Sequence, residues 1–311
     1  MEFTWTDERF ADLGGIRLCY QEMGDPDGEP MVLVMGLGTQ MIHWEDGFCE
    51  LLAREGFRAI RFDNRDIGRS TVLPGPPPGR LAMLAGVPRG AAYTLEDMSD
   101  DAAGLIEQLE LGDAHVVGAS MGGMIAQVLG YRRPERVRSL GLIMTGAGKR
   151  VTSLPRLRAL GALMREAPRE RDRYADHIVK VFKAIGSPAF PGQEERIRGH
   201  ALAAYDRGLS RAGVARQLHA ITSSGDRSQK LRSVRAPTVV IHGTENPLVR
   251  PGAGRQVAAA VPGARLVMVP GMGHDLPPEV WPVIAGELIA NARRPVDGDL
   301  PDSGRALSVA A

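Results

Sequence analysis

The sequence is poor in cysteine, in net charge and in long apolar runs. Its 311 residues include only two cysteines, Cys19 and Cys49, with no metal-type spacing. We expect both to be buried thiols in a reducing cytoplasm, not a disulfide. No apolar run approaches the length of a membrane span, and residues 1–10 are acidic and polar, unlike a signal peptide. These absences predict a cytoplasmic protein that does not bind membranes.

The charges of the chain almost cancel. There are 38 Lys and Arg residues against 37 Asp and Glu, which gives a formal net charge of +1. This balance offers no electrostatic reason to expect nucleic acid or an anionic membrane as a partner. It leaves a small molecule as the expected partner, and it does not decide between a monomer and a homodimer.

Short apolar runs of strand length alternate with helical patterns in two parts of the chain. Because strands that alternate with helices are connected by right-handed crossovers, this pattern predicts a mostly parallel sheet. The expected strands span residues 9–13, 16–23, 31–35, 57–62, 115–117, 137–144, 237–241 and 265–269.

The alternation stops between about residues 146 and 229, where helical patterns follow one another without strands. We interpret this stretch as a helical cap inserted into an α/β core. The expected helices of the cap span residues 153–166, 169–185, 193–207 and 211–222. The predicted division is a core of residues 1–145 and 230–294, a cap of residues 146–229, and a mobile C-terminal tail of residues 295–311.

The pentapeptide Gly118–Gly122 places a serine between an expected strand and an expected helix. The run 115–117 before it is typical of a buried strand, and the run 121–129 after it is apolar all round. Strand, G-x-S-x-G and helix together form a nucleophile elbow, in which a sharp turn exposes the serine hydroxyl above the sheet edge. Ser120 is therefore the expected nucleophile.

A serine nucleophile needs a base, and His274 is the expected one. It lies in a glycine-rich loop directly after the last expected strand. Since parallel strands end at one edge of the sheet, this loop shares an edge with Ser120. A weaker rival is His43, which lies on a loop of the same edge. We expect His115 and His242 to be structural residues of strands, and His177, His200 and His219 to lie at the surface of the cap.

Two backbone N–H groups are needed to hold the oxyanion of an acyl-transfer reaction. We expect them from Met121, which follows the nucleophile, and from Leu37, in the turn after the strand 31–35. Gly36 and Gly38 let that turn approach the substrate closely. The expected substrate-lining residues of the cap are Leu160, Met164 and Phe182.

Five motifs together make the chain resemble the α/β-hydrolases across about residues 8–293. They occupy residues 35–38, 63–70, 118–122, 242–247 and 271–274. The chain is most similar to capped esterases of the aclacinomycin methylesterase type, which are kin of enol-lactone hydrolases and cofactor-free haloperoxidases. The resemblance implies an eight-stranded, mostly parallel sheet with helices on both faces and an inserted cap, and it implies neither a cofactor nor a metal. We interpret residues 63–70 as a polar turn that holds loops, not as a metal or phosphate site.

The chain departs from the family where the acid of the catalytic triad usually stands. The family usually has G-x-x-D after the seventh strand, and this chain has Asn246 in place of the aspartate. Residues 145–148, the other usual location, contain no acid. Three interpretations stay open: an introduced substitution that slows turnover and traps a ligand, Glu245 acting as the acid, or a natural protein with weak or lost catalysis.

The sequence therefore predicts a serine hydrolase that cleaves carboxylic esters or lactones of a small to medium apolar substrate through an acyl-enzyme. Ser120 and His274 carry the chemistry, with Asn246 at the acid position. One alternative is a homologue that binds a small ligand under the cap without turning it over. Another is an enzyme like the cofactor-free haloperoxidases.

Overall fold

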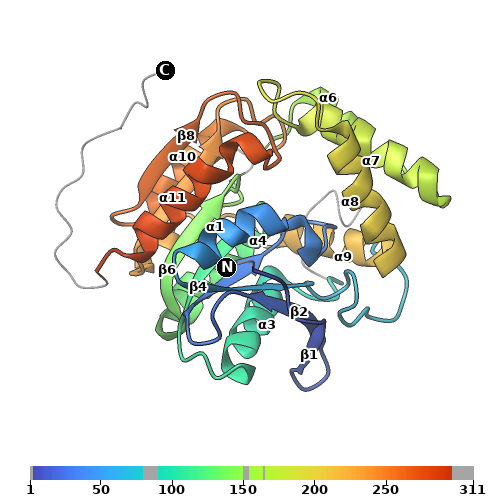
Figure 1. Ribbon diagram of the computed structural model, residues 1–311. Helices are drawn as coiled ribbons and strands as arrows, with labels where there is room; N and C mark the ends of the chain where they lie inside the picture. The colour runs from blue at the N-terminus through green and yellow to red at the C-terminus, as the bar shows by residue number, and fades with distance from the viewer. Residues whose placement is uncertain (1–2, 80–89, 150–153, 164, 296–311) are drawn as a thin grey trace.

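An eight-stranded sheet runs through the molecule in the order β1-β2-β4-β3-β5-β6-β7-β8 (Figure 1). The computed structural model describes residues 3–79, 90–149, 154–163 and 165–295. β1 and β2 form an antiparallel hairpin, β2 is antiparallel to β4, and the other neighbours are parallel, so the expected sheet is confirmed. The strands are β1 (Arg9–Asp12), β2 (Arg17–Met23), β3 (Glu29–Val34), β4 (Phe57–Phe62), β5 (Ala114–Ala119), β6 (Val137–Ile143), β7 (Thr238–Gly243) and β8 (Arg265–Val269).

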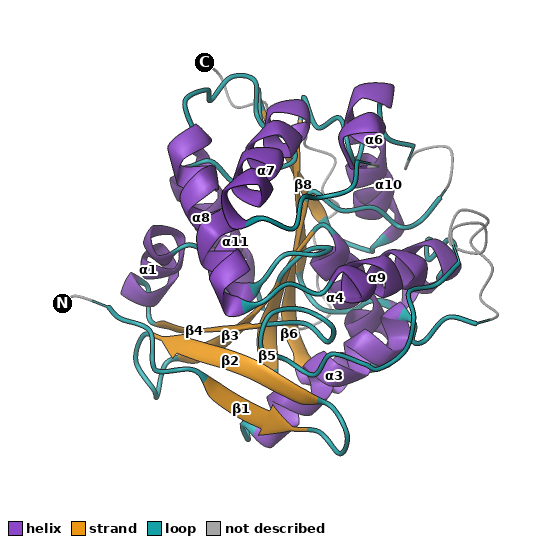
Figure 2. Cartoon of the chain, turned by 90° about the vertical axis from the view of Figure 1, so that its right-hand side faces the viewer, coloured by secondary structure: helices purple, strands orange, loops and turns teal. Residues whose placement is uncertain are grey.

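Helices cover both faces of the sheet. Successive side chains of a strand point to opposite faces, so Val32 and Val34 of β3 join one core cluster while Met31 and Leu33 join another. Figure 2 views the sheet nearly edge-on, with α1 and α11 on one side and α3 and α4 on the other. The first cluster packs under α3 (Leu95–Gln108), α4 (Met121–Arg132) and α10 (Pro251–Ala260), and the second under α1 (Asp46–Arg54) and α11 (Trp281–Ala292).

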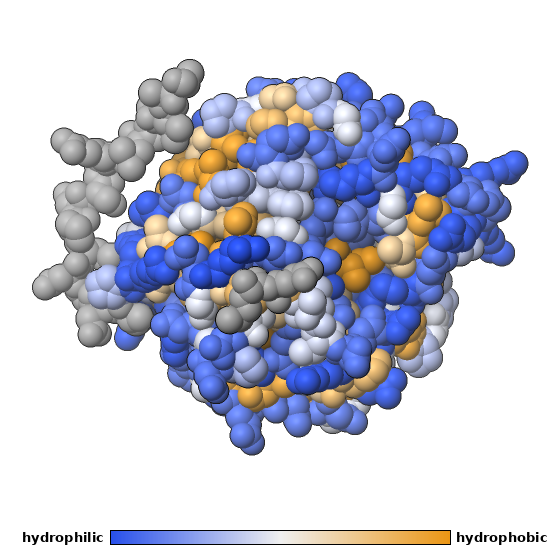
Figure 3. All heavy atoms as spheres, in the orientation of Figure 1, coloured by the Kyte–Doolittle hydropathy of each residue, from blue (hydrophilic) through white to orange (hydrophobic). Residues whose placement is uncertain are grey.

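Four further helices follow one another between β6 and β7. They are α6 (Leu157–Leu163), α7 (Arg171–Ile185), α8 (Glu194–Arg207) and α9 (Arg211–Ser223), which we call the helical segment. In Figure 1 they form an arc along the upper right of the molecule, and Figure 3 shows a mostly hydrophilic surface on that side. The expected helix over residues 153–166 is too long, since α6 begins four residues later and ends at Leu163. The expected tail, apart from residue 295, lies outside the described residues.

Local sequence signals account for several features of this fold. Thr94 caps the N-terminus of α3, because its hydroxyl accepts a hydrogen bond from the Asp97 N–H while the Asp97 side chain accepts one from the Thr94 N–H. Cys19 and Cys49 are buried and free, as expected, and burial raises the pKa of the Cys19 thiol to about 12. No helix in the described part of the chain has the length and apolar character to cross a membrane.

The strand register brings two pairs of loops together at one edge of the sheet. Val34 of β3 lies beside Gly118 of β5, so the turn after β3 adjoins the turn that carries Ser120. Gly243 of β7 lies beside Val269 of β8, so the loops after these two strands are also neighbours. The carboxyl ends of parallel strands are where α/β proteins bind ligands, and all the expected catalytic residues lie there.

Candidate functional site

Ser120 occupies a strained turn between β5 and α4. Its backbone angles are φ 55° and ψ −115°, in the positive-φ region that side chains other than glycine rarely adopt. A Cβ on Gly118 would lie 2.2 Å from the Gly122 carbonyl oxygen, and a Cβ on Gly122 would lie 2.0 Å from the Val34 carbonyl oxygen. Both positions therefore require glycine, which explains the G-x-S-x-G pattern physically.

His274 meets Ser120 from the loop after β8. Its Nε2 atom lies 3.0 Å from Ser120 Oγ, within hydrogen-bonding distance. The backbone N–H of His274 donates to the Ile185 carbonyl oxygen at the end of α7 (2.8 Å), which ties this loop to the helical segment. Burial, with a smaller effect from His242, lowers the pKa of His274 to about 3. The imidazole is therefore neutral at physiological pH.

Asn246 lies on the far side of the His274 ring and is fully buried. His274 Nδ1 lies 3.0 Å from Asn246 Nδ2 and 3.2 Å from Asn246 Oδ1. The same Oδ1 atom accepts hydrogen bonds from the backbone N–H groups of Leu248 (3.1 Å) and Val249 (2.9 Å). Asparagine thus occupies the place beside the histidine that an aspartate usually fills.

No carboxylate contacts His274 in the part of the chain that the structure describes. The neighbouring residue Glu245 is exposed. Asp275 follows His274 in sequence, but its carboxylate accepts a hydrogen bond from the Ser187 hydroxyl. Neither carboxylate, as placed, contacts the His274 ring.

The turn after β3 lies directly beside Ser120. A Cβ on Gly36 would lie 3.2 Å from the Ser120 Cβ, and Gly38 has a φ of +68°. Gln217 of α9 holds this turn in place, because its Oε1 accepts a hydrogen bond from the Gly38 N–H at 2.9 Å. Among the described residues, the N–H groups of Leu37 and Met121 donate no hydrogen bond, so both are free for a ligand.

The expected substrate-lining residues are dispersed over the helical segment. Leu160 lies on α6 with 42% of its surface exposed, and Phe182 lies on α7 against the cluster that contains Val181. Met164 lies outside the described residues. A pocket of about 390 Å³ between α6 and α7 is lined in part by Val181, but not by Ser120 or His274. The lining role of these residues stays a prediction.

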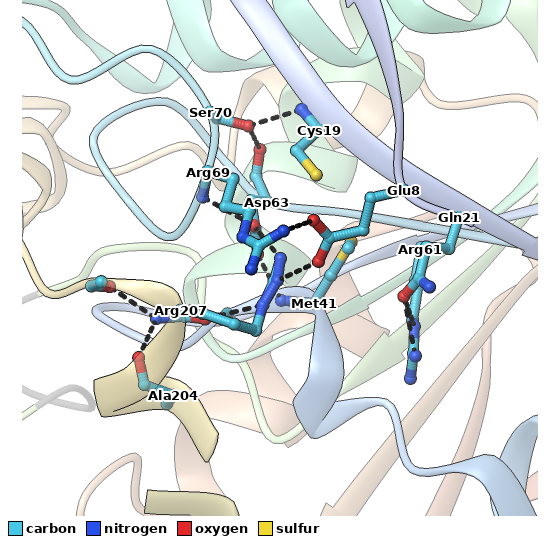
Figure 4. Close-up of polar contacts among 12 residues, drawn as sticks. Glu8, Cys19, Gln21, Met41, Arg61, Asp63, Arg69, Ser70, Ala204 and Arg207 are labelled. Carbon is cyan, nitrogen blue, oxygen red and sulfur yellow. Dashed lines mark hydrogen bonds and ion pairs between the residues drawn. The ribbon is translucent and has the colours of Figure 1, made fainter. Parts of the chain in front are cut away.

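Residues 63–70 hold the helical segment against the core, in agreement with their interpretation as a polar turn. Asp63 accepts from the Met41 N–H (2.8 Å) and from the Arg69 N–H (3.0 Å). Figure 4 shows Arg207 reaching the same carboxylate from α8, where its Nη2 atom lies 2.6 Å from Asp63, while its Nη1 atom binds Glu8. Burial raises the pKa of Asp63 despite the opposing effect of Arg207. No group of three or more metal-binding side chains occurs in the described ranges.

Three residues of the helical segment that support the site have no signal of their own in the sequence: Arg207, Arg216 and Gln217. Arg216 of α9 forms two hydrogen bonds of 2.7 Å with Asp66, and Gln217 donates to the Arg65 carbonyl oxygen at 2.9 Å. The expectation that His219 lies at the surface is wrong, since it is 1% exposed. All of these residues face the core from helices whose amphipathic pattern is weak.

Comparison with known proteins agrees with this architecture. Rhodomycin D methylesterase DauP of Streptomyces sp. (strain C5) is 27% identical over 299 residues, which cover 89% of this chain and 95% of that protein. A hydrolase from Pseudomonas aeruginosa PA01 is 25% identical with a TM-score of 0.69, over 93% of this chain and 99% of that chain. The enol-lactonase from Burkholderia xenovorans LB400, 24% identical, shares the fold with a TM-score of 0.72 over 92% of this chain and 100% of its own.

The match to a family extends over most of the chain. Residues 29–279 match the family described as the alpha/beta hydrolase fold. This range includes the strained serine, the histidine that meets it and Asn246. The chain therefore belongs to the α/β-hydrolase fold family.

Proposed function

We propose that the chain is a serine hydrolase of carboxylic esters or lactones, built for an acyl-enzyme mechanism and slowed by Asn246. The observation that carries this proposal is the 3.0 Å approach of His274 Nε2 to a Ser120 hydroxyl held at a positive φ. A nucleophile and base within hydrogen-bonding distance are the minimum that covalent acyl transfer needs. The strained turn supports the same assignment, since such geometry is costly and concentrates at reactive sites.

Each of the remaining groups has a defined task in this reaction. Ser120 Oγ attacks the carbonyl carbon, and its proton passes to His274 Nε2 and then to the leaving alkoxide. The N–H groups of Leu37 and Met121 stabilise the oxyanion, at the N-terminus of α4 where the helix dipole favours negative charge. Water then attacks the acyl-enzyme with His274 as base, which releases the acid and restores Ser120.

The proposed substrate is a small to medium apolar ester or lactone, bound between the core and the helical segment acting as a cap. Similarity to a protein named rhodomycin D methylesterase supports ester chemistry. Val214 of α9 supports an apolar roof, because its methyl carbons lie 3.2 and 3.3 Å from the Cβ position of Gly38. The bond from the His274 N–H to Ile185 supports contact between the cap and the catalytic loop.

Asn246 limits the rate because it carries no charge. When His274 takes the serine proton it becomes an imidazolium, and an ionised aspartate would stabilise that cation where an amide cannot. The corresponding Asp→Asn change in chymotrypsin-like proteases lowers turnover about 10⁴-fold. We therefore expect Asn246→Asp to raise the rate of hydrolysis of short nitrophenyl esters by between about 10² and 10⁴.

Initial rates of nitrophenyl acetate and butyrate hydrolysis by the two proteins test this proposal. Glu245→Gln in both backgrounds is the matched control, because it removes the neighbouring carboxylate without touching the histidine. Loss of the parent's activity in Glu245→Gln would assign the acid to Glu245 and contradict the role given to position 246. No activity in any of the four proteins would contradict the esterase.

Asn246 also favours a second function, that of a ligand-binding homologue which does not turn its ligand over. The two functions differ in whether Ser120 reacts. We expect a fluorophosphonate to label Ser120 slowly in the parent and rapidly in Asn246→Asp, while Ser120→Ala stays unlabelled. An unlabelled parent and an unlabelled Asn246→Asp would favour the binding protein.

A further inference from the structure

The orientation of the Asn246 amide is fixed by the chain itself. Two backbone N–H groups, those of Leu248 and Val249, point at one atom of the side chain at 3.1 and 2.9 Å. Only the amide oxygen can accept them, since the NH₂ group is itself a donor. A flipped amide would set donors against donors in a fully buried position, which is a costly arrangement. Oδ1 therefore faces the backbone and both of its lone pairs are occupied.

This orientation decides which nitrogen of His274 carries the proton. The nearer amide atom to His274 Nδ1 is Nδ2, at 3.0 Å, and Nδ2 can only donate. A proton on Nδ1 would confront the amide hydrogen, and the Oδ1 atom 3.2 Å away has no free lone pair for it. Nδ1 must then be the acceptor, so the resting neutral His274 carries its proton on Nε2, and it can take the Ser120 proton only from its minor tautomer with the proton on Nδ1.

The tautomer changes what the elbow presents to a ligand. The Nε2–H group donates to Ser120 Oγ at 3.0 Å, so the serine hydrogen is free to point outward. In the described part of the chain, Ser120 Oγ has no other hydrogen-bond partner and the N–H groups of Leu37 and Met121 have none. The elbow and the adjoining turn after β3 therefore offer three donors that no described residue uses, and no described carboxylate contacts Ser120.

We propose that Asn246 makes the resting elbow a donor-rich site that binds a carboxylate anion. A carboxylate matches it because its two oxygens only accept hydrogen bonds and its charge suits the helix N-terminus. Such an anion is also the acid that ester hydrolysis releases, so the site retains its own product. This inference rests on the assignment of Ser120 and His274 under the proposed function, and it concerns binding, which needs no turnover.

The tautomer is measured by long-range ¹H–¹⁵N NMR of the protein labelled with ¹⁵N-histidine. We expect His274 to be protonated on Nε2 in the parent and on Nδ1 in Asn246→Asp, because an aspartate accepts from Nδ1. His242 is an internal reference in both proteins, since its Nε2 donates to the Val249 carbonyl oxygen at 2.8 Å. Protonation of His274 on Nδ1 in the parent would overturn the inference.

The binding site is tested by titrating both proteins with acetate at pH 8.5, with acetamide as the uncharged probe of the same shape. We expect acetate to bind the parent at least about tenfold more tightly than Asn246→Asp, which adds a negative charge near the ligand. Ser120→Ala should weaken acetate binding to the parent, because it removes the outward donor. Equal affinity of the parent for acetate and acetamide, or of the parent and Asn246→Asp for acetate, would contradict the site.

These outcomes separate the inference from the proposed function. Acetate binding that depends on Asn246 and Ser120, with no esterase activity in any variant, would keep the carboxylate site and refute the hydrolase. Esterase activity in Asn246→Asp without acetate binding to the parent would keep the hydrolase and refute the carboxylate site.

Discussion

His274 is a buried imidazole whose neighbours are an amide and a second imidazole, not a carboxylate. Burial and His242 both disfavour its charged form, and in the described ranges no acid beside it opposes them. His43 is a second example, because its own burial and the nearby His200 lower its pKa to about 4. His274 and His43 therefore stay neutral in the folded chain at a pH where a free histidine is protonated. This difference makes the free energy of unfolding depend on pH.

The free energy of unfolding should fall as the pH falls from about 6.5 toward 3. In the unfolded chain His274 takes up a proton near its ordinary pKa of 6.5, whereas in the folded chain it does so only near 3. Protons then bind the unfolded state preferentially in this window, so stability is fully present above pH 6.5 and is lost below it. Each such histidine contributes at most about 1.4 kcal/mol per pH unit.

Urea unfolding at pH 7, 6 and 5 measures this slope, and Asn246→Asp is the comparison. An aspartate beside the ring raises the pKa of His274, so we expect a flatter dependence between pH 6.5 and 5 in the variant. Titrating groups that the two proteins share contribute equally to both, so the slopes differ only through His274 and the new carboxylate. Identical slopes would show that His274 is not the buried neutral group described above.

Helix α9 contains site residues whose position could not be predicted from the local sequence. The elbow, His274 and Asn246 could be predicted because each follows a strand within a short motif, and parallel strands bring those positions together without further information. Gln217 could not be predicted, since its partner Gly38 is 179 residues away and nothing local distinguishes it from a surface glutamine. The lining residues Leu160 and Phe182 stay predictions for the same reason, because helix packing and not strand order places them.

Gln217→Leu should lower the catalytic rate of the Asn246→Asp protein by between about 10 and 100-fold, with a smaller change in KM. Leucine keeps the size of the side chain but leaves the Gly38 N–H and the Arg65 carbonyl unpaired, so the turn that carries the Leu37 N–H loses its support. Stopped-assay kinetics with nitrophenyl esters measure the effect. Gln193→Leu is the control, since its amide contacts the exposed Glu279. An unchanged rate in Gln217→Leu would exclude a positioning role.

Buried ion pairs join the helical segment to the core. Asp63 and Asp66 are both fully buried, and their partners Arg207 and Arg216 come from α8 and α9. Burial alone would raise the pKa of Asp66, but hydrogen bonds from Arg216 and the Leu73 N–H outweigh it and hold that pKa below its ordinary value. The sequence showed a polar turn at residues 63–70, but not which of the many arginines would pair with it.

Arg216→Met should destabilise the whole molecule by about 3–5 kcal/mol, because it leaves the Asp66 carboxylate buried without its cation. Asp66→Asn combined with Arg216→Met should cost less than Arg216→Met alone, since no unpaired charge is then buried. Arg171→Met is the matched control. It breaks an ion pair with Asp206 of similar geometry that is exposed on both sides, and we expect little measurable effect.

Urea unfolding of the four proteins at pH 7 tests this architecture. A loss in Arg216→Met no larger than that in Arg171→Met would mean that the pair does not join α9 to the core. A double variant as unstable as Arg216→Met would show that the loss comes from the missing arginine contacts, such as the bond to the Leu73 carbonyl oxygen, and not from the isolated charge. A double variant that is partly restored in stability would show that the unpaired Asp66 charge causes the loss, and that Arg216 is needed to neutralise it when the helical segment packs on the core.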